Sequence, residues 1–146
     1  MTSPSGFLLE HANGLIKYRS SQAQGAVFMD SKSAIIAFSQ SEKIKAGLIW
    51  ASQTLEVNAS LPETEIKGSQ QIIAALLNMI ANEIHIAMKM APHPRWEATM
   101  KHINTALVMV NSNVAHDAPF HLSKALSQAT SIGHESMTLL SEQGLL

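Results

Sequence analysis

The chain has 146 residues, of which 46% are hydrophobic and only 14% are charged, and its formal net charge is −1. Its Ala, Leu, Met, Ile and Gln favour helices and exclude a disordered or fibrous chain. The balance of 10 basic and 11 acidic residues excludes the basic surface that attracts nucleic acids and anionic lipids, and the absence of Cys excludes disulfides and thiolate ligands.

In chain order, the first predicted helix begins at Ser3-Pro4 and ends near Tyr18. It carries apolar residues at helical spacing: Leu8, Ala12 and Leu15. Polar residues such as Glu10 and Asn13 interrupt the apolar core that a signal peptide needs, and we find no stretch of about 20 apolar residues. We therefore expect a cytoplasmic protein without a membrane partner.

A second helix is expected to begin at Asp30 or Ser31 and to end within residues 58–62. Its apolar residues share a loosely common face: Ile35, Phe38, Leu48, Ile49 and Leu55. Because Glu42 and Lys45 interrupt this face one turn apart, a break near residues 39–41 is an open alternative.

The third helix has the clearest amphipathic pattern, and Ser69 is its predicted cap. One apolar stripe has i, i+3, i+4, i+7 spacing: Ile73, Leu76, Leu77, Ile80, Ile84, Ala87 and Met88. A second apolar set widens it: Ile72, Met79, Ile86 and Met90. Apolar surface over more than half the circumference indicates a helix at the centre of a bundle or one shared with a partner subunit.

Glu83 lies within this broad apolar arc. A carboxylate there either reaches water at the edge of the arc or pairs with a cation, because an unpaired buried carboxylate is costly. The candidate partners are Arg95, His102 or a lysine, from the same subunit or another.

Pro92 and Pro94 end the third helix and begin the fourth. The fourth helix has a heptad seam: Trp96, Met100, Ile103, Leu107, Val110 and Val114. Asp117 is the predicted cap of a fifth helix, Pro119 fits its first turn, and Gly144 is a stop. Its apolar residues are Leu122, Leu126, Ala129, Ile132, Met137 and Leu140.

These elements predict a single all-α domain over residues 1–146. Short connections make the last three helices antiparallel neighbours, which favours an up-and-down bundle of four long helices. The N-terminal helix is expected to pack on this bundle or to be exchanged with a partner. The low charge suits burial against another copy or another protein, since interface centres are depleted in charge, and a monomer with a neutral polar surface is the alternative. We therefore predict a homo-oligomer, most simply a dimer, with these candidate interface residues: Ile72, Met79, Glu83, Ile86 and Met90.

Seven histidines raise the possibility of a metal site. His116, Asp117 and His121 form the closest local corner, but the chain has neither a Glu-x-x-His pair nor a His-Glu-x-x-His sequence. Solvated histidines and an N-cap Asp are the alternative interpretation. We predict no metal and no cofactor, with a metal-binding bundle left as an alternative.

The segment His121-Leu-Ser-Lys124-Ala125 resembles the helix of histidine phosphotransfer domains, which are four-helix bundles. The resemblance covers about a dozen residues and implies that His121 accepts a phosphoryl group whose charge Lys124 offsets. It departs from the family at Ala125, which replaces a usual Gly, and at Leu126, which replaces a small polar residue.

Arg95 and His102, with six residues between them, resemble the Arg-x(4–6)-His motif of HEPN-type ribonucleases, which are all-α and dimeric. That resemblance implies that Arg95 binds a phosphate and His102 transfers a proton. Trp96 replaces the usual polar residue after the Arg, and the basic surface of an RNA-binding protein is missing.

No Gly-x-Ser-x-Gly elbow, glycine-rich phosphate loop or dinucleotide fingerprint occurs. The sequence therefore favours a non-enzymatic interaction module that self-associates. The eight Met residues indicate either core filling or an adaptable groove for a partner helix.

Overall fold

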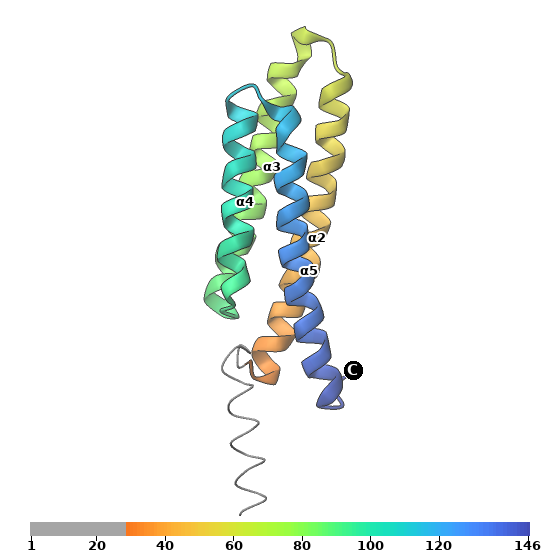
Figure 1. Cartoon of the computed structure of the whole chain (residues 1–146), viewed down its shortest axis with the longest axis vertical. Coiled ribbons are helices and arrows are strands. Elements are labelled where there is room, and N and C mark those ends of the chain that lie inside the picture. The colour runs from red at the N-terminus through yellow and green to blue at the C-terminus, as the bar shows by residue number, and fades with distance from the viewer. Residues whose placement is uncertain (1–28) are drawn as a thin grey trace, which may run out of the picture.

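The computed structural model describes residues 29–146, which form an up-and-down bundle (Figure 1). Its elements are α2 (Ser31–Ser60), α3 (Glu63–Met90), α4 (Pro94–Asn111), the short 3₁₀ helix η2 (Ala115–Asp117) and α5 (Ala118–Glu142). The described part contains helices and no strand, as the all-α prediction requires. The helix expected over residues 3–18 lies outside the described residues.

Helix α2 begins where the sequence predicts. The Asp30 carboxylate accepts a hydrogen bond from the Ser33 backbone N–H at 2.7 Å, which satisfies one of the free donors of the first turn. The helix runs without interruption through residues 39–41, so the alternative of a break is wrong. Ser41 is fully buried there, and its hydroxyl donates to the Phe38 carbonyl at 2.8 Å. Two residues assigned to the apolar face, Ile35 and Ile49, are exposed.

Helix α3 begins at Glu63, so the prediction of Ser69 as its cap is wrong. Glu63 and Glu65 occupy the first turn, where their negative charges interact favourably with the positive end of the helix dipole. Ser69 lies inside the helix instead. Its hydroxyl contacts the Ile66 carbonyl and the Asn58 side chain, and the second contact joins the start of α3 to the end of α2.

Helix α4 buries the predicted heptad seam as far as Val110, but Val114 lies beyond the helix end and is exposed. The turn closes at Asn113, which has φ 61°, and the Val114 N–H donates to the Met109 carbonyl at 3.0 Å. Asn tolerates this left-handed conformation better than most residues. The heptad pattern therefore continues past the point where the backbone turns.

Helix α5 has Pro119 in its first turn, as predicted, but the Asp117 side chain makes no capping hydrogen bond. Asp117 instead ends the preceding 3₁₀ helix, which itself supplies the entry into α5. The predicted apolar residues are buried or partly buried except Met137, which is 43% exposed. Gly144 follows the last turn with φ +69°, and the Leu145 N–H returns to the Leu140 carbonyl at 2.9 Å.

Helices α2 and α5, the first and last described, pack side by side along the bundle (Figure 1). Small buried residues allow this close approach: Ala34, Ala37 and Ser41 on α2, and Ala125, Ala129, Gly133 and Ser136 on α5. Helix α3 then packs on α2 and α4, and α4 on α5. This closed ring of contacts leaves the outer side of each of the four helices uncovered within the described chain.

Candidate functional site

The side of α3 that faces away from the core carries an apolar seam. Ile72 is 71% exposed, Met79 64%, Ile86 42% and Met90 54%. With the partly buried Leu76 and Glu83, these residues have successive spacings of four, three, four, three and four positions, the spacing of a coiled-coil seam. We call these six residues the outer seam.

A second seam, displaced by one residue, faces the core of the bundle. It consists of Ile73, Leu77, Ile80, Ile84 and Ala87, all buried. One residue corresponds to about 100° around a helix, so α3 presents two separate apolar faces. Within residues 29–146, the other helices cover the inner face only.

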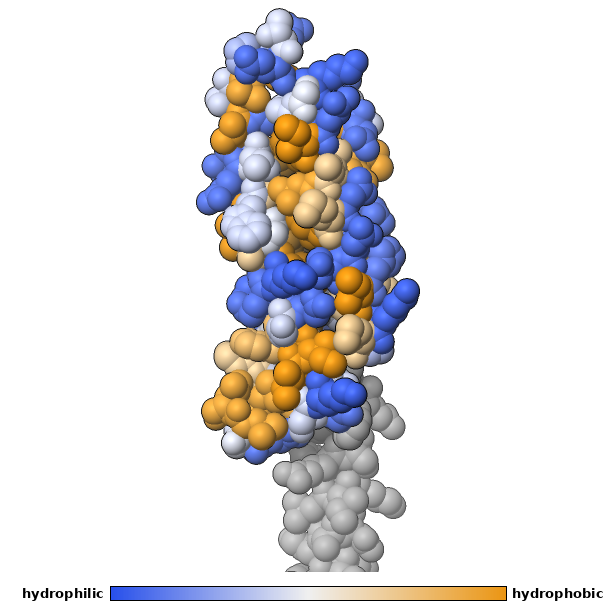
Figure 2. Space-filling view, turned by 180° about the vertical axis from the view of Figure 1, so that it is seen from behind, coloured by the Kyte–Doolittle hydropathy of each residue, from blue (hydrophilic) through white to orange (hydrophobic). Residues whose placement is uncertain are grey.

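Helix α2 extends the outer seam sideways. Lys43, Trp50 and Val57 follow one another at intervals of seven residues, and Trp50 and Val57 are 61% and 59% exposed. The contacts of Lys43 with Glu83 and of Asn58 with Ser69 place this row beside the outer seam. We call the row and the outer seam together the α2/α3 face. Figure 2 looks onto the molecule from behind, where apolar areas lie above and below a hydrophilic band.

Glu83 pairs with Lys43, and their Nζ and Oε1 atoms lie 2.8 Å apart. The partner is therefore a lysine of α2 rather than Arg95 or His102. The other carboxylate oxygen of Glu83, Oε2, is buried and has no hydrogen-bond partner among the described residues. Glu83 thus retains an acceptor that no described residue uses.

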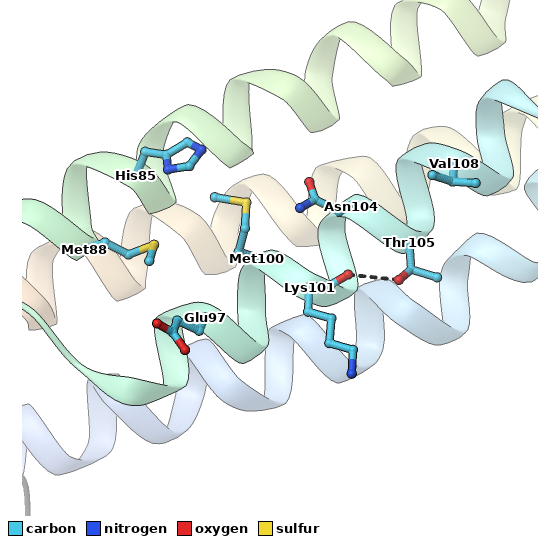
Figure 3. Close-up of a pocket in the computed structure, with 8 residues that line it drawn as sticks. All are labelled: His85, Met88, Glu97, Met100, Lys101, Asn104, Thr105 and Val108. Atoms are coloured by element: carbon cyan, nitrogen blue, oxygen red, sulfur yellow. Dashed lines mark hydrogen bonds between the residues drawn. The ribbon is translucent and has the colours of Figure 1, made fainter.

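An open groove of about 580 Å³ lies between α3 and α4. Figure 3 shows its lining residues, which are His85, Met88, Glu97, Met100, Lys101, Asn104, Thr105 and Val108. His85 and Met88 come from α3 and the other six from α4. The Thr105 hydroxyl is already engaged with the Lys101 carbonyl at 2.9 Å. The groove is mainly apolar, and it separates the α2/α3 face from α4.

His102 on α4 and His121 on α5 lie together, with ring centroids 5.8 Å apart and planes tilted by 34°. The sequence analysis assigned these two residues to different motifs. Burial, and then the charges of His121, Lys101 and Lys124, lower the pKa of His102 below its ordinary value of 6.5. The Lys124 ammonium lies 5.3 Å from the centre of the Phe120 ring, a cation–π contact that engages the lysine of the phosphotransfer-like pair.

Arg95, the other half of the ribonuclease-like pair, is held by α5. Its Nε donates to Glu135 at 3.2 Å and its Nη1 to Gln128 at 3.1 Å. The guanidinium is therefore occupied by protein groups, while His102 packs against His121. The two residues of the motif thus have different neighbours.

His93 has a structural role that the sequence analysis did not predict. Its side chain is 2% exposed, and its Nδ1 accepts from the Arg95 N–H at 3.2 Å. Because Nδ1 is an acceptor, Nε2 carries the proton and donates to Glu135, 2.8 Å away. His93 therefore caps α4 and fastens it to α5. Its place directly before a proline at a helix start was the available indication.

At the predicted metal corner, His116 and Asp117 approach each other with Nε2 and Oδ2 3.5 Å apart. His121 lies against His102 and Phe120. Within residues 29–146, no three His, Asp or Glu side chains are arranged to hold a metal ion.

One helix of the described part, α3, is long and apolar enough to cross a membrane by length and composition, and 28% of its most apolar window is buried. The two apolar seams account for this composition.

No protein-family model, curated protein or solved structure matches the chain.

Acidification is expected to destabilise the protein partly through His102. Its folded pKa lies below 6.5, so between that folded value and 6.5 the unfolded chain binds more protons, and stability falls as the pH falls. Urea unfolding at pH 7.5 and 5.5 should show a larger loss for the natural chain than for His102→Gln. Equal losses in both proteins would contradict this assignment.

Proposed function

We propose that this protein is a non-enzymatic interaction module that forms a homodimer through its α2/α3 face. The observation that supports the proposal is the outer seam, which has coiled-coil spacing and has no cover in the described chain. Such a seam packs against another helix of the same pattern, and a second copy supplies one.

The size of the face supports a second copy as its occupant. Its six exposed apolar side chains are Trp50, Val57, Ile72, Met79, Ile86 and Met90. They offer several hundred Å² of surface, the same order as the ~800 Å² that each partner contributes to a standard interface. Most monomers expose smaller apolar patches than this, or use them for binding.

Charge supports the same occupant. The face carries one cation and one anion at its middle, Lys43 and Glu83, so it is neutral and complementary to a copy of itself. An anionic lipid surface favours a cluster of basic residues, and the face has only one. We also propose that the protein is cytoplasmic and acts without a cofactor.

Sedimentation velocity and native mass spectrometry of the full chain test the proposal. We expect a dimer at micromolar concentration, and Met79→Glu and Ile86→Glu should each raise the dimer dissociation constant at least ~100-fold, because each buries a carboxylate. Val108→Glu is the matched control, because Val108 is 62% exposed on α4 outside the face. The dimer dissociation constant of Val108→Glu should equal that of the natural chain.

Urea unfolding of the same variants separates association from folding. At a concentration where all are monomeric, Met79→Glu should unfold at the same urea concentration as the natural chain, since Met79 is exposed in the single subunit. A natural chain that stays monomeric at ~100 µM, a concentration at which even weak specific dimers form, would refute the proposal.

A further inference from the structure

We propose that the two-fold axis of this dimer runs parallel to the helices, between α2 and α3, so that Lys43 of each copy meets the partner's Glu83. This inference rests on the proposed function and adds the orientation of the second copy. In this arrangement α2 of one subunit packs on α3 of the other, and the two intrachain ion pairs join into one cluster of four alternating charges.

The register between α2 and α3 is fixed by three contacts. Lys43 lies beside Glu83, a Cβ added at Gly47 would lie 3.1 Å from the Ile80 side chain, and Asn58 contacts Ser69. The two helices are therefore antiparallel, and positions on each can be assigned to common levels along the bundle, at 1.5 Å for each residue.

A two-fold axis parallel to the helices keeps every residue at its own level and exchanges α2 with α3. At the charged level, Lys43 then faces the partner's Glu83. Above it, the indole of Trp50 faces the partner's α3 near Leu76 and Met79. The Trp50 level therefore meets apolar side chains of the partner, and the charged level meets its opposite charge.

The other simple two-fold axis lies across the helices and places α2 on α2 and α3 on α3. If it passes through the charged level, it sets Lys43 against the partner's Lys43 and Glu83 against the partner's Glu83. If it passes through any other level, each ion pair is buried against apolar side chains. Like charges at close range and uncompensated buried charges both cost free energy, so the charge pattern favours the parallel axis.

The free acceptor on Glu83 suits the same arrangement. One carboxylate oxygen already binds Lys43 of its own subunit, and Oε2 has no partner among residues 29–146. A carboxylate accepts several hydrogen bonds. A small rotation of the side chain would present that oxygen to the partner's Lys43, which has three donors of its own.

Because the natural chain contains no Cys, single-cysteine chains test the orientation directly. We make Lys43→Cys and Glu83→Cys in separate chains, one with an affinity tag, mix them to exchange subunits, and oxidise. The proposal predicts a disulfide between the two different chains in the mixture and little cross-linking of either chain alone. Leu145→Cys, near the end of the bundle and outside the face, is the control.

The outcomes separate the two proposals. Cross-linking of Lys43→Cys with itself would overturn the parallel axis and favour the crossed one. No cross-link in any sample, while the natural chain remains a dimer that Met79→Glu dissociates, would overturn the orientation and leave the dimer standing. A monomeric natural chain would refute the proposed function itself.

Discussion

Replacing Trp96 with alanine is expected to destabilise the protein by about 3–5 kcal/mol, the usual cost of truncating a fully buried aromatic side chain. Trp96 has no exposed surface, and its indole N–H donates to the Ala91 carbonyl at 3.1 Å. The change leaves a cavity at the start of α4 and removes the donor of a buried carbonyl. Urea unfolding followed by circular dichroism measures the loss.

Trp96→Phe separates the two contributions. It retains most of the apolar volume but removes the indole N–H, so a loss of about 1–3 kcal/mol is expected, mainly from the unsatisfied Ala91 carbonyl. Because the chain has two Trp residues, this variant also leaves Trp50 as its only indole fluorophore. A loss below about 1 kcal/mol for Trp96→Ala would contradict the assignment of Trp96 to the core.

The second large effect is expected at Gly133, where α5 approaches α2. A Cβ added there would lie 2.7 Å from the Ser41 hydroxyl oxygen, closer than such atoms pack. Gly133→Ala should therefore destabilise the protein by about 1–3 kcal/mol through overpacking, although alanine is otherwise the better helix former by about 1 kcal/mol. Thermal unfolding measured by circular dichroism gives the shift.

Two further variants isolate that cause. At Gly68, inside α3, an added Cβ meets nothing within 4 Å, so Gly68→Ala should stabilise the protein by up to about 1 kcal/mol. Removing the obstructing hydroxyl in the double variant Ser41→Ala/Gly133→Ala should recover much of the loss. If the double variant is no more stable than Gly133→Ala, the clash with Ser41 is not the cause.

The helices were predictable because their patterns are local. Asp30 is followed by a favourable first turn, and the heptad of α4 is complete over several turns. The start of α3 was not predictable from apolar spacing, because residues 63–69 are mostly polar. Their helical conformation depends in part on Ser69 reaching Asn58 across the bundle, a contact between segments that only the folded chain brings together.

The candidate site was predictable to a similar extent. The apolar spacing identified Ile72, Met79, Ile86 and Met90 as one arc, and all four are exposed. The contribution of Trp50 and Val57 depends on how α2 lies beside α3, and so does the choice of Lys43 as the partner of Glu83. Periodicity within one helix carries no information about the register between two helices, so these parts of the face required the structure.

The close contact of α2 with α5 has a consequence during synthesis. The Ser31 side chain contacts that of Gln143, 112 residues later, so the side of α2 that α5 covers stays exposed until α5 has been synthesised. Leucine or phenylalanine side chains on this side of α2 would expose a large, aggregation-prone apolar surface during that interval. Ala34, Ala37 and Ser41 expose little apolar surface, so we expect the same small residues that allow close packing to make the nascent chain less prone to aggregation.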